Sequence, residues 1–472
     1  MSNLVIVESP AKAKTIEGFL GSDFTVRSCY GHIRELPKKG DPIDVENNFN
    51  PTYVVPQDKK KVVSELSNLA KKSKIVWLAT DEDREGEAIS WHLLHALKLK
   101  EENTKRITFN EITKNAVLKA VDNPRDIDEN LVNSQQARRI LDRLVGYELS
   151  PVLWRKVKPN LSAGRVQSVT VKLIVQREQE IADHKPVEMF KVVANFEYSG
   201  VKFKAELSSN LASQNEAITF LNSLKNKGFK VIRVTKKPGK RTPSAPFITS
   251  TLQQEASSKL GINPKETMAI AQKLYENGHI TYMRTDSLAL SDDALADIKK
   301  KVVKEFGEDY YQETKYKSKD KNSQEAHEAC RPCKFSKHTL ENDENITFRE
   351  NRLYKLIWQR TVMSQMKPAK VEITNIKIGY KDEEDKVNKN QFISKKEFIT
   401  FDGFLKAYTI FKKKEEEEVE ECEEDEDVSE LIEKDDKKVL EKLKPDMECT
   451  YQKITTAQKY TKPPQARFTE AS

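Results

Sequence analysis

In Ile75-Val76-Trp77-Leu78-Ala79-Thr80-Asp81-Glu82-Asp83-Arg84-Glu85-Gly86-Glu87, five apolar residues run directly into a cluster of acids. The apolar run predicts a short buried strand. Apolar residues at helical spacing from Ile89 to Leu97 predict a helix behind it. A strand followed at once by a helix is typical of an α/β unit, and the acids stand at the turn between the two.

The N-terminus repeats this arrangement. Leu4 to Val7 predicts another buried strand, and Ser9-Pro10 supplies an N-cap and a proline at the first position of a helix that we expect to reach Leu20. Two such units in the first third of the chain predict an α/β domain with a mostly parallel sheet.

Carboxylates follow both predicted strands. Catalytic groups in open α/β sheets lie beyond the carboxyl ends of the strands, and Glu8 ends the first strand as Asp81 ends the second. Asp81, Asp83 and Glu85 alternate, so we expect them to converge on one side and, with Glu8, to bind Mg²⁺, a cation that prefers oxygen ligands. The alternative is an acidic helix N-terminus that the helix dipole stabilises. The cluster alone fits a nuclease, a primase or a topoisomerase.

Charge is distributed unevenly. The chain has 472 residues, too many for one core, and a net charge of +7. Residues 415–436 hold 15 acids and one lysine, a local charge of −14, so the rest of the chain carries +21. A body this basic predicts a polyanionic partner.

The sequence contains no run of about 18 apolar residues, so we expect no transmembrane helix. Five scattered cysteines and the absence of a signal-peptide pattern favour a reduced, cytoplasmic protein.

The remaining chain changes pattern several times. Residues 130–181 are helical and basic, and residues 189–234 alternate as antiparallel strands do. Residues 236–246, with their prolines, predict a linker. Residues 247–365 are mostly helical, and alternation returns over residues 371–410. This order predicts a β-domain that holds a helical domain as an insertion, with a solvated acidic loop over 412–438.

One tyrosine segment points to a specific chemistry: Gly278-His279-Ile280-Thr281-Tyr282-Met283-Arg284-Thr285-Asp286-Ser287. A phenol is a weak nucleophile because its usual pKa is about 10. A cation two residues away, Arg284, can stabilise both a phenolate and a phosphate. Attack of Tyr282 on a phosphodiester would give a phosphotyrosine that stores the bond energy for resealing, without ATP. Tyr275 and Tyr354 are instead expected to pack in the core.

This segment resembles the active-site segment of type IA DNA topoisomerases of the bacterial topoisomerase I branch. The Glu8 strand together with Asp81-x-Asp83-x-Glu85 resembles their Toprim domain. The resemblance implies that Glu8 manages proton transfer at the broken bond, that the acids hold Mg²⁺, and that Lys12 stabilises phosphate charge.

Further blocks carry the same resemblance. Ala326-His327-Glu328-Ala329-Cys330-Arg331-Pro332 implies a histidine, His327, near the scissile phosphate; Cys330-x-x-Cys333 alone cannot complete a zinc site. Residues 136–168 resemble the family's single-strand groove, and residues 30–37 resemble a DNA-contacting stretch. The implied DNA-binding residues are His32, Arg138, Arg139, Asp142, Tyr147, Trp154, Ser162, Ala163, Gly164, Arg165, Val166, Gln167 and Arg284. Arginines suit phosphates, and Tyr147 and Trp154 offer stacking surfaces for unpaired bases.

The resemblance implies a multidomain, toroidal molecule with α/β, α and β parts. Its expected domains are a Toprim domain at 1–150, an incomplete groove domain at 151–185, a β-rich arch at 186–245 and 368–455, a helical domain with Tyr282 at 246–367, and a returning groove segment at 456–472. The family's chain continues past a segment like residues 463–472, so we expect a C-terminal truncation.

The implied function is ATP-independent relaxation of negatively supercoiled DNA by a monomer that binds single-stranded segments and uses Mg²⁺. A topoisomerase III-like decatenase is an alternative, although that branch has proline where Met283 stands. A DNA-binding fragment without activity is the alternative from another class.

Overall fold

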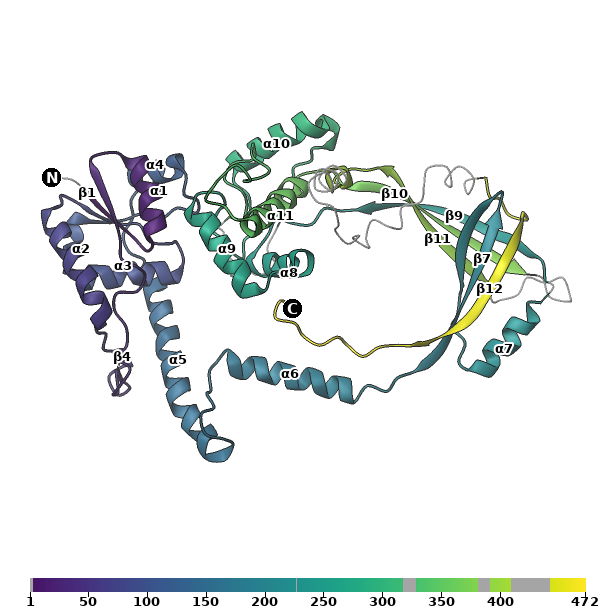
Figure 1. Cartoon of the computed structure of the whole chain (residues 1–472), viewed down its shortest axis with the longest axis horizontal. Coiled ribbons are helices and arrows are strands. Elements are labelled where there is room, and N and C mark those ends of the chain that lie inside the picture. The colour runs from purple at the N-terminus through teal and green to yellow at the C-terminus, as the bar shows by residue number, and fades with distance from the viewer. Residues whose placement is uncertain (1–2, 226, 317–327, 381–390, 409–441) are drawn as a thin grey trace.

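The computed structural model describes residues 3–225, 227–316, 328–380, 391–408 and 442–472. His327 and the acidic loop predicted at 412–438 lie outside these residues. Within the described part, the chain forms an N-terminal α/β domain, two long helices, a β-barrel and a block of helices (Figure 1).

The N-terminal domain is built on a four-stranded sheet in the order β2-β1-β5-β6, in which all neighbouring strands are parallel. β1 pairs directly with β5, with Leu4 opposite Val76 and Ile6 opposite Leu78. The predicted helix forms as expected, capped by Ser9 and ending at Leu20. The domain's elements are β1 (Asn3–Val7), α1 (Pro10–Leu20), β2 (Phe24–Ser28), β3 (Ile43–Asp44), β4 (Asn50–Pro51), α2 (Lys60–Lys72), β5 (Val76–Leu78), α3 (Arg84–Ala96), β6 (Thr104–Arg106) and α4 (Lys114–Asp122).

Two helices lead away from this domain. α5 (Glu129–Lys156) packs against α3 near its start and then extends outward, and α6 (Gln167–Ala182) runs on to the barrel (Figure 1). α6 has no buried residue within the described part of the chain.

Six strands close into a barrel in the order β10-β11-β8-β7-β12-β9. They are β7 (Glu188–Tyr198), β8 (Val201–Leu207), β9 (Phe229–Arg241), β10 (Ala369–Tyr380), β11 (Phe392–Phe401) and β12 (Glu448–Thr461), with α7 (Gln214–Ser223) between β8 and β9. The linker predicted at 236–246 is wrong over its first half, because β9 continues to Arg241 and pairs with β10 along its whole length. Pro238 is tolerated there because β12 pairs with β9 only near Phe229, which leaves the other edge of β9 open at the proline.

The helical block lies between β9 and β10 in sequence. Its helices are α8 (Thr249–Leu260), α9 (Pro264–Glu276), α10 (Asp292–Phe306) and α11 (Phe348–Ser364). One hydrophobic core extends from Val5 and Val7 of the sheet to Tyr275 and Ile280 of the helical block. This continuous core holds the block against the N-terminal domain.

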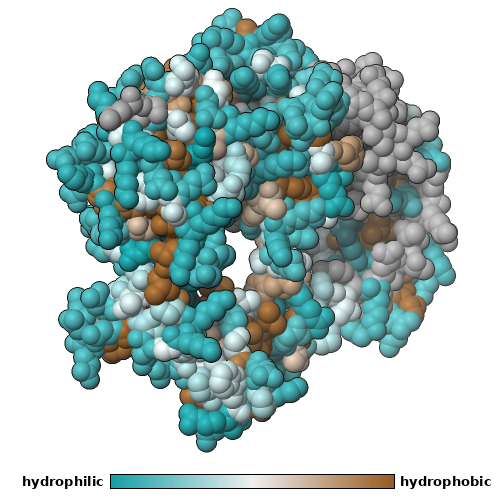
Figure 2. Space-filling view, turned by 60° about the vertical axis from the view of Figure 1, so that its left-hand side comes forward, coloured by the Kyte–Doolittle hydropathy of each residue, from teal (hydrophilic) through white to brown (hydrophobic). Residues whose placement is uncertain are grey.

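The domains follow one another around an open centre (Figure 1), and the space-filling view shows an opening through the molecule (Figure 2). Among the described helices, none is both long enough and apolar enough to cross a bilayer.

Candidate active site

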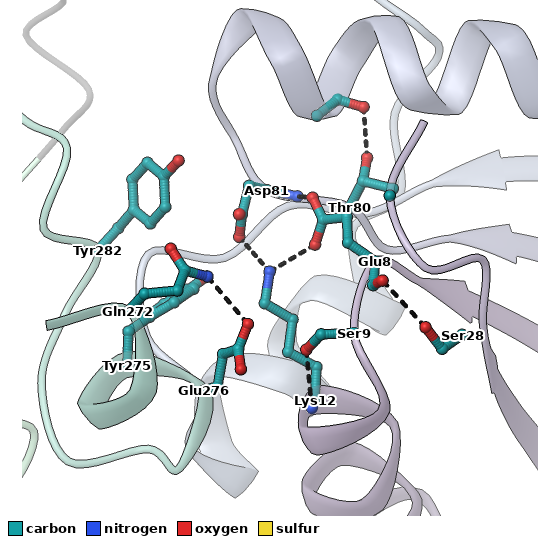
Figure 3. A network of polar contacts seen from close by, with 12 residues as sticks. Glu8, Ser9, Lys12, Ser28, Thr80, Asp81, Gln272, Tyr275, Glu276 and Tyr282 are labelled. Atoms are coloured by element: carbon teal, nitrogen blue, oxygen red, sulfur yellow. Dashed lines mark hydrogen bonds and ion pairs between the residues drawn. The ribbon is translucent and has the colours of Figure 1, made fainter. Parts of the chain in front are cut away.

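Lys12 lies between two carboxylates at the ends of neighbouring strands (Figure 3). Its Nζ is 2.5 Å from Glu8 Oε2 and 2.5 Å from Asp81 Oδ1, and its side chain is 1% exposed. Because β1 and β5 are paired, Glu8 and Asp81 leave the sheet side by side, and the Asp81 N–H donates to Glu8 Oε1 at 2.6 Å. The first turn of α1 aims Lys12 at the same point.

Electrostatics in this cluster follow from burial. Burial lowers the pKa of Lys12, but the charges of Asp81 and Glu8 outweigh it and raise that pKa above its usual value. Burial and the Glu8 carboxylate raise the pKa of Asp81 to about 7, against the opposing charge of Lys12. Lys12 carries one positive charge between two carboxylates, so the site can accept a further cation.

Asp83 and Glu85 do not join this pair. α3 begins at Arg84, so Asp83 becomes its N-cap and accepts from the Gly86 N–H at 2.9 Å. Glu85 turns toward His32, 3.5 Å away, and accepts from Gln135 at 3.0 Å. His32 is the main cause of a Glu85 pKa lowered to about 2. The predicted convergence of alternating acids is therefore corrected: the helix rotates them apart, and the described residues contain no group of three ligating side chains placed to hold a metal ion.

The carboxylates nevertheless supply the type of ligand atom that Mg²⁺ prefers. Mg²⁺ binds through oxygen and commonly uses only one or two protein carboxylates, keeping water as its other ligands. Glu8 and Asp81 offer oxygen ligands only, and together they place two carboxylates against the single positive charge of Lys12.

Tyr282 reaches this cluster from the helical block. Its side chain is nearly buried, and its hydroxyl donates to Asp83 Oδ2 at 2.6 Å. Arg284 Nη1 is 3.9 Å from the same oxygen. Burial, followed by the charges of Asp81 and Asp83, raises the pKa of Tyr282, and Arg284 opposes this shift only in part. The phenol is therefore protonated in this arrangement, with its proton directed at a carboxylate.

A short segment, residues 109–112, joins the two domains; we call it the contact loop. The Tyr282 N–H donates to the Asn110 carbonyl at 2.8 Å, and the Tyr275 hydroxyl donates to the Phe109 carbonyl at 3.4 Å. Arg331 Nη1 is 3.1 Å from Glu111. Sequence reasoning did not identify the contact loop, because its contribution is mostly through backbone carbonyls, which any residue type can supply.

Other predicted residues have simpler surroundings. Tyr275 and Tyr354 are buried, as predicted for core tyrosines. Cys330 and Cys333 are free thiols. His327 lies outside the described residues, so its position beside the site stays a prediction.

Comparisons with known proteins match this arrangement. A family model described as "Toprim domain" matches residues 3–112, and one described as "DNA topoisomerase" matches residues 126–472. The chain belongs to the type IA DNA topoisomerase family.

Individual relatives agree with the assignment. "DNA topoisomerase 1" of Streptomyces coelicolor is 43% identical over 99% of this chain and 52% of its own length, so the chain spans about half of that curated relative. The full-length topoisomerase I structure from Thermotoga maritima superposes with a TM-score of 0.81 at 36% identity, covering 99% of this chain and 74% of that one. The expected multidomain α/β fold is thereby confirmed.

In this family member, the predicted DNA-binding residues other than His32 and Arg284 lie on α5, on the turn that leads to α6 and at the first residue of α6. Arg138 and Arg139 are exposed on α5. Tyr147 is 54% exposed and Trp154 49% exposed, so both offer ring surface to solvent. Their polar atoms are anchored: the Tyr147 hydroxyl donates to the Lys38 carbonyl at 3.1 Å, and the Trp154 Nε1–H donates to the Leu161 carbonyl at 2.5 Å.

The turn itself is held by local contacts. Arg165 Nε is 2.5 Å from Asp142 Oδ1, and Gln167 donates to Ser162 Oγ at 3.0 Å. The Ala163 N–H donates to Ser150 Oγ, and the Gly164 N–H to Ser168 Oγ. Val166 is exposed, and His32 faces Glu85 rather than this turn.

Proposed function

We propose that the chain carries the cleavage and resealing centre of an ATP-independent type IA DNA topoisomerase. The observation that carries the proposal is the 2.6 Å hydrogen bond from the Tyr282 hydroxyl to Asp83, which joins the tyrosine of one domain to the acids of another. A buried tyrosine packed for stability alone would not need a carboxylate partner with an adjacent arginine.

The cleavage step would proceed as follows. The phenol oxygen attacks a phosphodiester phosphorus of a single strand and passes its proton to Asp83, its hydrogen-bond acceptor. The bond from phosphorus to the 3′ oxygen breaks, and that oxygen takes up a proton from the Glu8–Lys12 pair. The product is a 5′-phosphotyrosine and a free 3′ hydroxyl, and resealing reverses each transfer.

Cations around the site support this step. Arg284, beside the nucleophile, would stabilise charge on the phosphate. Glu8 and Asp81, which lie side by side, would hold Mg²⁺, and the ion would supply further stabilisation of negative charge at the phosphate. Before DNA binds, Lys12 pairs with Glu8 and Asp81 and offsets part of their negative charge.

We further propose that α5 and the 162–167 turn bind single-stranded DNA, that the open centre admits DNA, and that opening the contact between Tyr282 and the Toprim domain allows a second strand through the break. Relaxation of negatively supercoiled DNA by a monomer follows, since underwound DNA offers single strands readily. The proposed domains are those expected above.

The test is cleavage of a labelled single-stranded oligonucleotide with Mg²⁺, read as a covalent protein–DNA adduct on a denaturing gel. We expect an adduct from the native chain, none from Tyr282→Phe, and an undiminished yield from Tyr311→Phe, a matched change elsewhere in the helical block. An adduct that survives in Tyr282→Phe would refute the assignment. Plasmid relaxation with and without Mg²⁺ then separates the full reaction from binding alone.

A further inference from the structure

A cavity with both polar and apolar walls lies at the contact between the Toprim domain and the helical block, and Tyr282 is not among its lining residues. It has a volume of about 310 Å³. The Toprim side contributes the start of α4, and the helical block contributes Gly278 and His279 together with the segment 334–340. Phe19, Ile112, Leu340 and Tyr354 form apolar walls.

Three lysines line this cavity: Lys114 from the Toprim domain, and Lys334 and Lys337 from the helical block. All three are exposed, and none makes an ion pair within the part of the chain that the structure describes. The charges of these lysines act on His279, which also lines the cavity. Burial is the main cause that lowers the pKa of His279, and the charge of Asp343 opposes it. Lys337 and Lys334 then lower this pKa further.

Hydrogen bonds hold the backbone that forms one wall of this cavity. The Tyr354 hydroxyl donates to the Lys334 carbonyl at 3.3 Å and to the Lys337 carbonyl at 2.9 Å, so a buried side chain fixes the backbone that carries both lysines. On the opposite wall, α4 starts with Thr113 as N-cap, and Thr113, Lys114 and Asn115 line the cavity, so the positive end of the helix dipole lies beside it.

One nearby acid offsets part of this charge: Asp343 is 3.6 Å from His279 and interacts electrostatically with Lys337. Glu111 pairs with Arg331 instead. One carboxylate against three lysines leaves the cavity with a net positive charge. Without an anion, Lys114 repels Lys334 and Lys337 across the domain contact. An anion shared among them would remove this repulsion and favour the closed arrangement.

We propose that this cavity binds a phosphate oxyanion, either of a free polyphosphate or of the DNA backbone, and that the bound phosphate ties the Toprim domain to the helical block. The volume accommodates one phosphate together with the group next to it. The site would thus bias the same contact that positions Tyr282, because the contact loop continues directly into α4.

The test uses the full chain with EDTA present, so that metal at the acids plays no part, and reads amide hydrogen exchange at Tyr282, whose N–H crosses the domain contact to Asn110. Sodium pyrophosphate is the first probe and a single-stranded oligonucleotide the second. The variant is Lys334→Gln with Lys337→Gln. The control is Lys265→Gln with Lys304→Gln, which removes the same charge from exposed positions of the helical block outside the cavity.

We expect pyrophosphate to slow exchange at Tyr282 in the native chain and the control, and to bind the cavity variant about tenfold more weakly. If only the oligonucleotide slows exchange, and only with the lysines intact, the proposal stands with the DNA backbone as the source. Equal slowing in variant and control, or none with either probe, overturns it. Unchanged melting temperatures verify that both variants fold. No readout depends on cleavage, so failure here is distinct from failure of the proposed function.

Discussion

Gly86 lies in the first turn of α3, with its backbone pressed against the loop that carries Asp81. A Cβ at this position would stand 2.2 Å from the Asp81 carbonyl oxygen and 2.8 Å from its carbonyl carbon. Both neighbours are backbone atoms, so relief requires moving the loop that places Asp81 and Asp83. The residue is thus a requirement of the site's geometry rather than of its chemistry.

We therefore expect Gly86→Ala to lower oligonucleotide cleavage by about 100-fold or more and to cost about 1–3 kcal/mol in unfolding free energy. Gly18→Ala in α1 is the matched control, since nothing lies within 4 Å of its added Cβ. That change should stabilise the chain by about 0.5–1 kcal/mol, because alanine suits a helix better than glycine. Adduct yield and urea unfolding measure both effects, and equal behaviour of the two variants would contradict the argument.

Glu87 is fully buried one residue further on, where it meets Arg106 at 3.0 Å and Arg125 at 2.7 Å. Burial alone would raise the pKa of Glu87, but the hydrogen bond from Arg125 and the charge of Arg106 prevail and lower it to about 2. The role is structural: this carboxylate fastens β6 and the segment before α5 to α3.

A lowered pKa in the folded state stabilises the protein above the unfolded value of 4.5, and the gain is lost as pH falls through 4.5 toward 2. Glu87→Gln should cost about 3 kcal/mol at pH 7 and remove most of that pH dependence. Urea unfolding at pH 7 and pH 3.5 measures both. A variant that keeps the full native loss of stability on acidification would show that other carboxylates cause it.

At the scale of single residues, the sequence predicted those whose side-chain type and position indicate a chemical role. Tyr282 with Arg284, and Glu8 with Asp81, were found from nucleophile, cation and strand-end arguments, and the structure brings them together. Glu87 could not be separated from its acidic neighbours, because its burial depends on Arg106 and Arg125, which lie 19 and 38 residues away. The roles assigned to these residues remain predictions.

Among the elements, α5 is the one with a testable part in DNA binding. Arg138 is exposed on it, so it can neutralise a phosphate and release counterions. Arg138→Gln should reduce the log–log salt slope of single-strand binding by about 0.7. Lys119→Gln, an exposed change on α4, is the control and should leave the slope unchanged. Fluorescence anisotropy across a salt series measures it, and equal slopes for both variants would exclude Arg138 from the contact.

Elements with strong periodicity were predictable, and boundaries set by distant partners were not. The helix to Leu20 follows from its cap and spacing. β9 was cut short because Pro238 and Gly239 normally signal a turn, whereas pairing with β10 continues through both. In the same way, alternation of Asp81, Asp83 and Glu85 assumed extended backbone, but α3 starts at Arg84. Tertiary pairing and helix initiation decided these cases, and neither is visible in a short window.

At the scale of the whole molecule, Gly278 lies in the contact between the Toprim domain and the helical block, which we propose opens during strand passage. An added Cβ at Gly278 would stand 2.5 Å from the Ile112 carbonyl of the contact loop, and its φ is +74°. Gly261, with φ +66° and nothing within 4 Å, carries the same backbone preference without the neighbour. Comparing alanine variants at Gly278 and Gly261 therefore separates two effects: the backbone strain of a positive φ, and the steric clash of the added Cβ with the contact loop.

We expect Gly278→Ala to speed amide exchange at Tyr282 and to reduce adduct yield about tenfold or more. Gly261→Ala should change neither, although both variants lose about 1 kcal/mol to backbone strain. Similar exchange rates at Tyr282 in the two variants would show that the contact tolerates the extra carbon.

The barrel closes across the two points where the chain leaves for the helical block and returns. Arg241 at the end of β9 and Ala369 at the start of β10 are direct partners in the ladder. A tight two-residue turn could therefore replace residues 242–368 and leave all six strands in register. Conversely, the excised segment has ends that already lie side by side, so it could be grafted between any two paired strands. The segment after β11 also packs on this block, with Phe404 and Ala407 in its core and Asp402 accepting from the Tyr310 hydroxyl. An exchange of the nucleophile-bearing segment between relatives would therefore leave the barrel ladder unchanged but would have to carry residues 402–408 along with it.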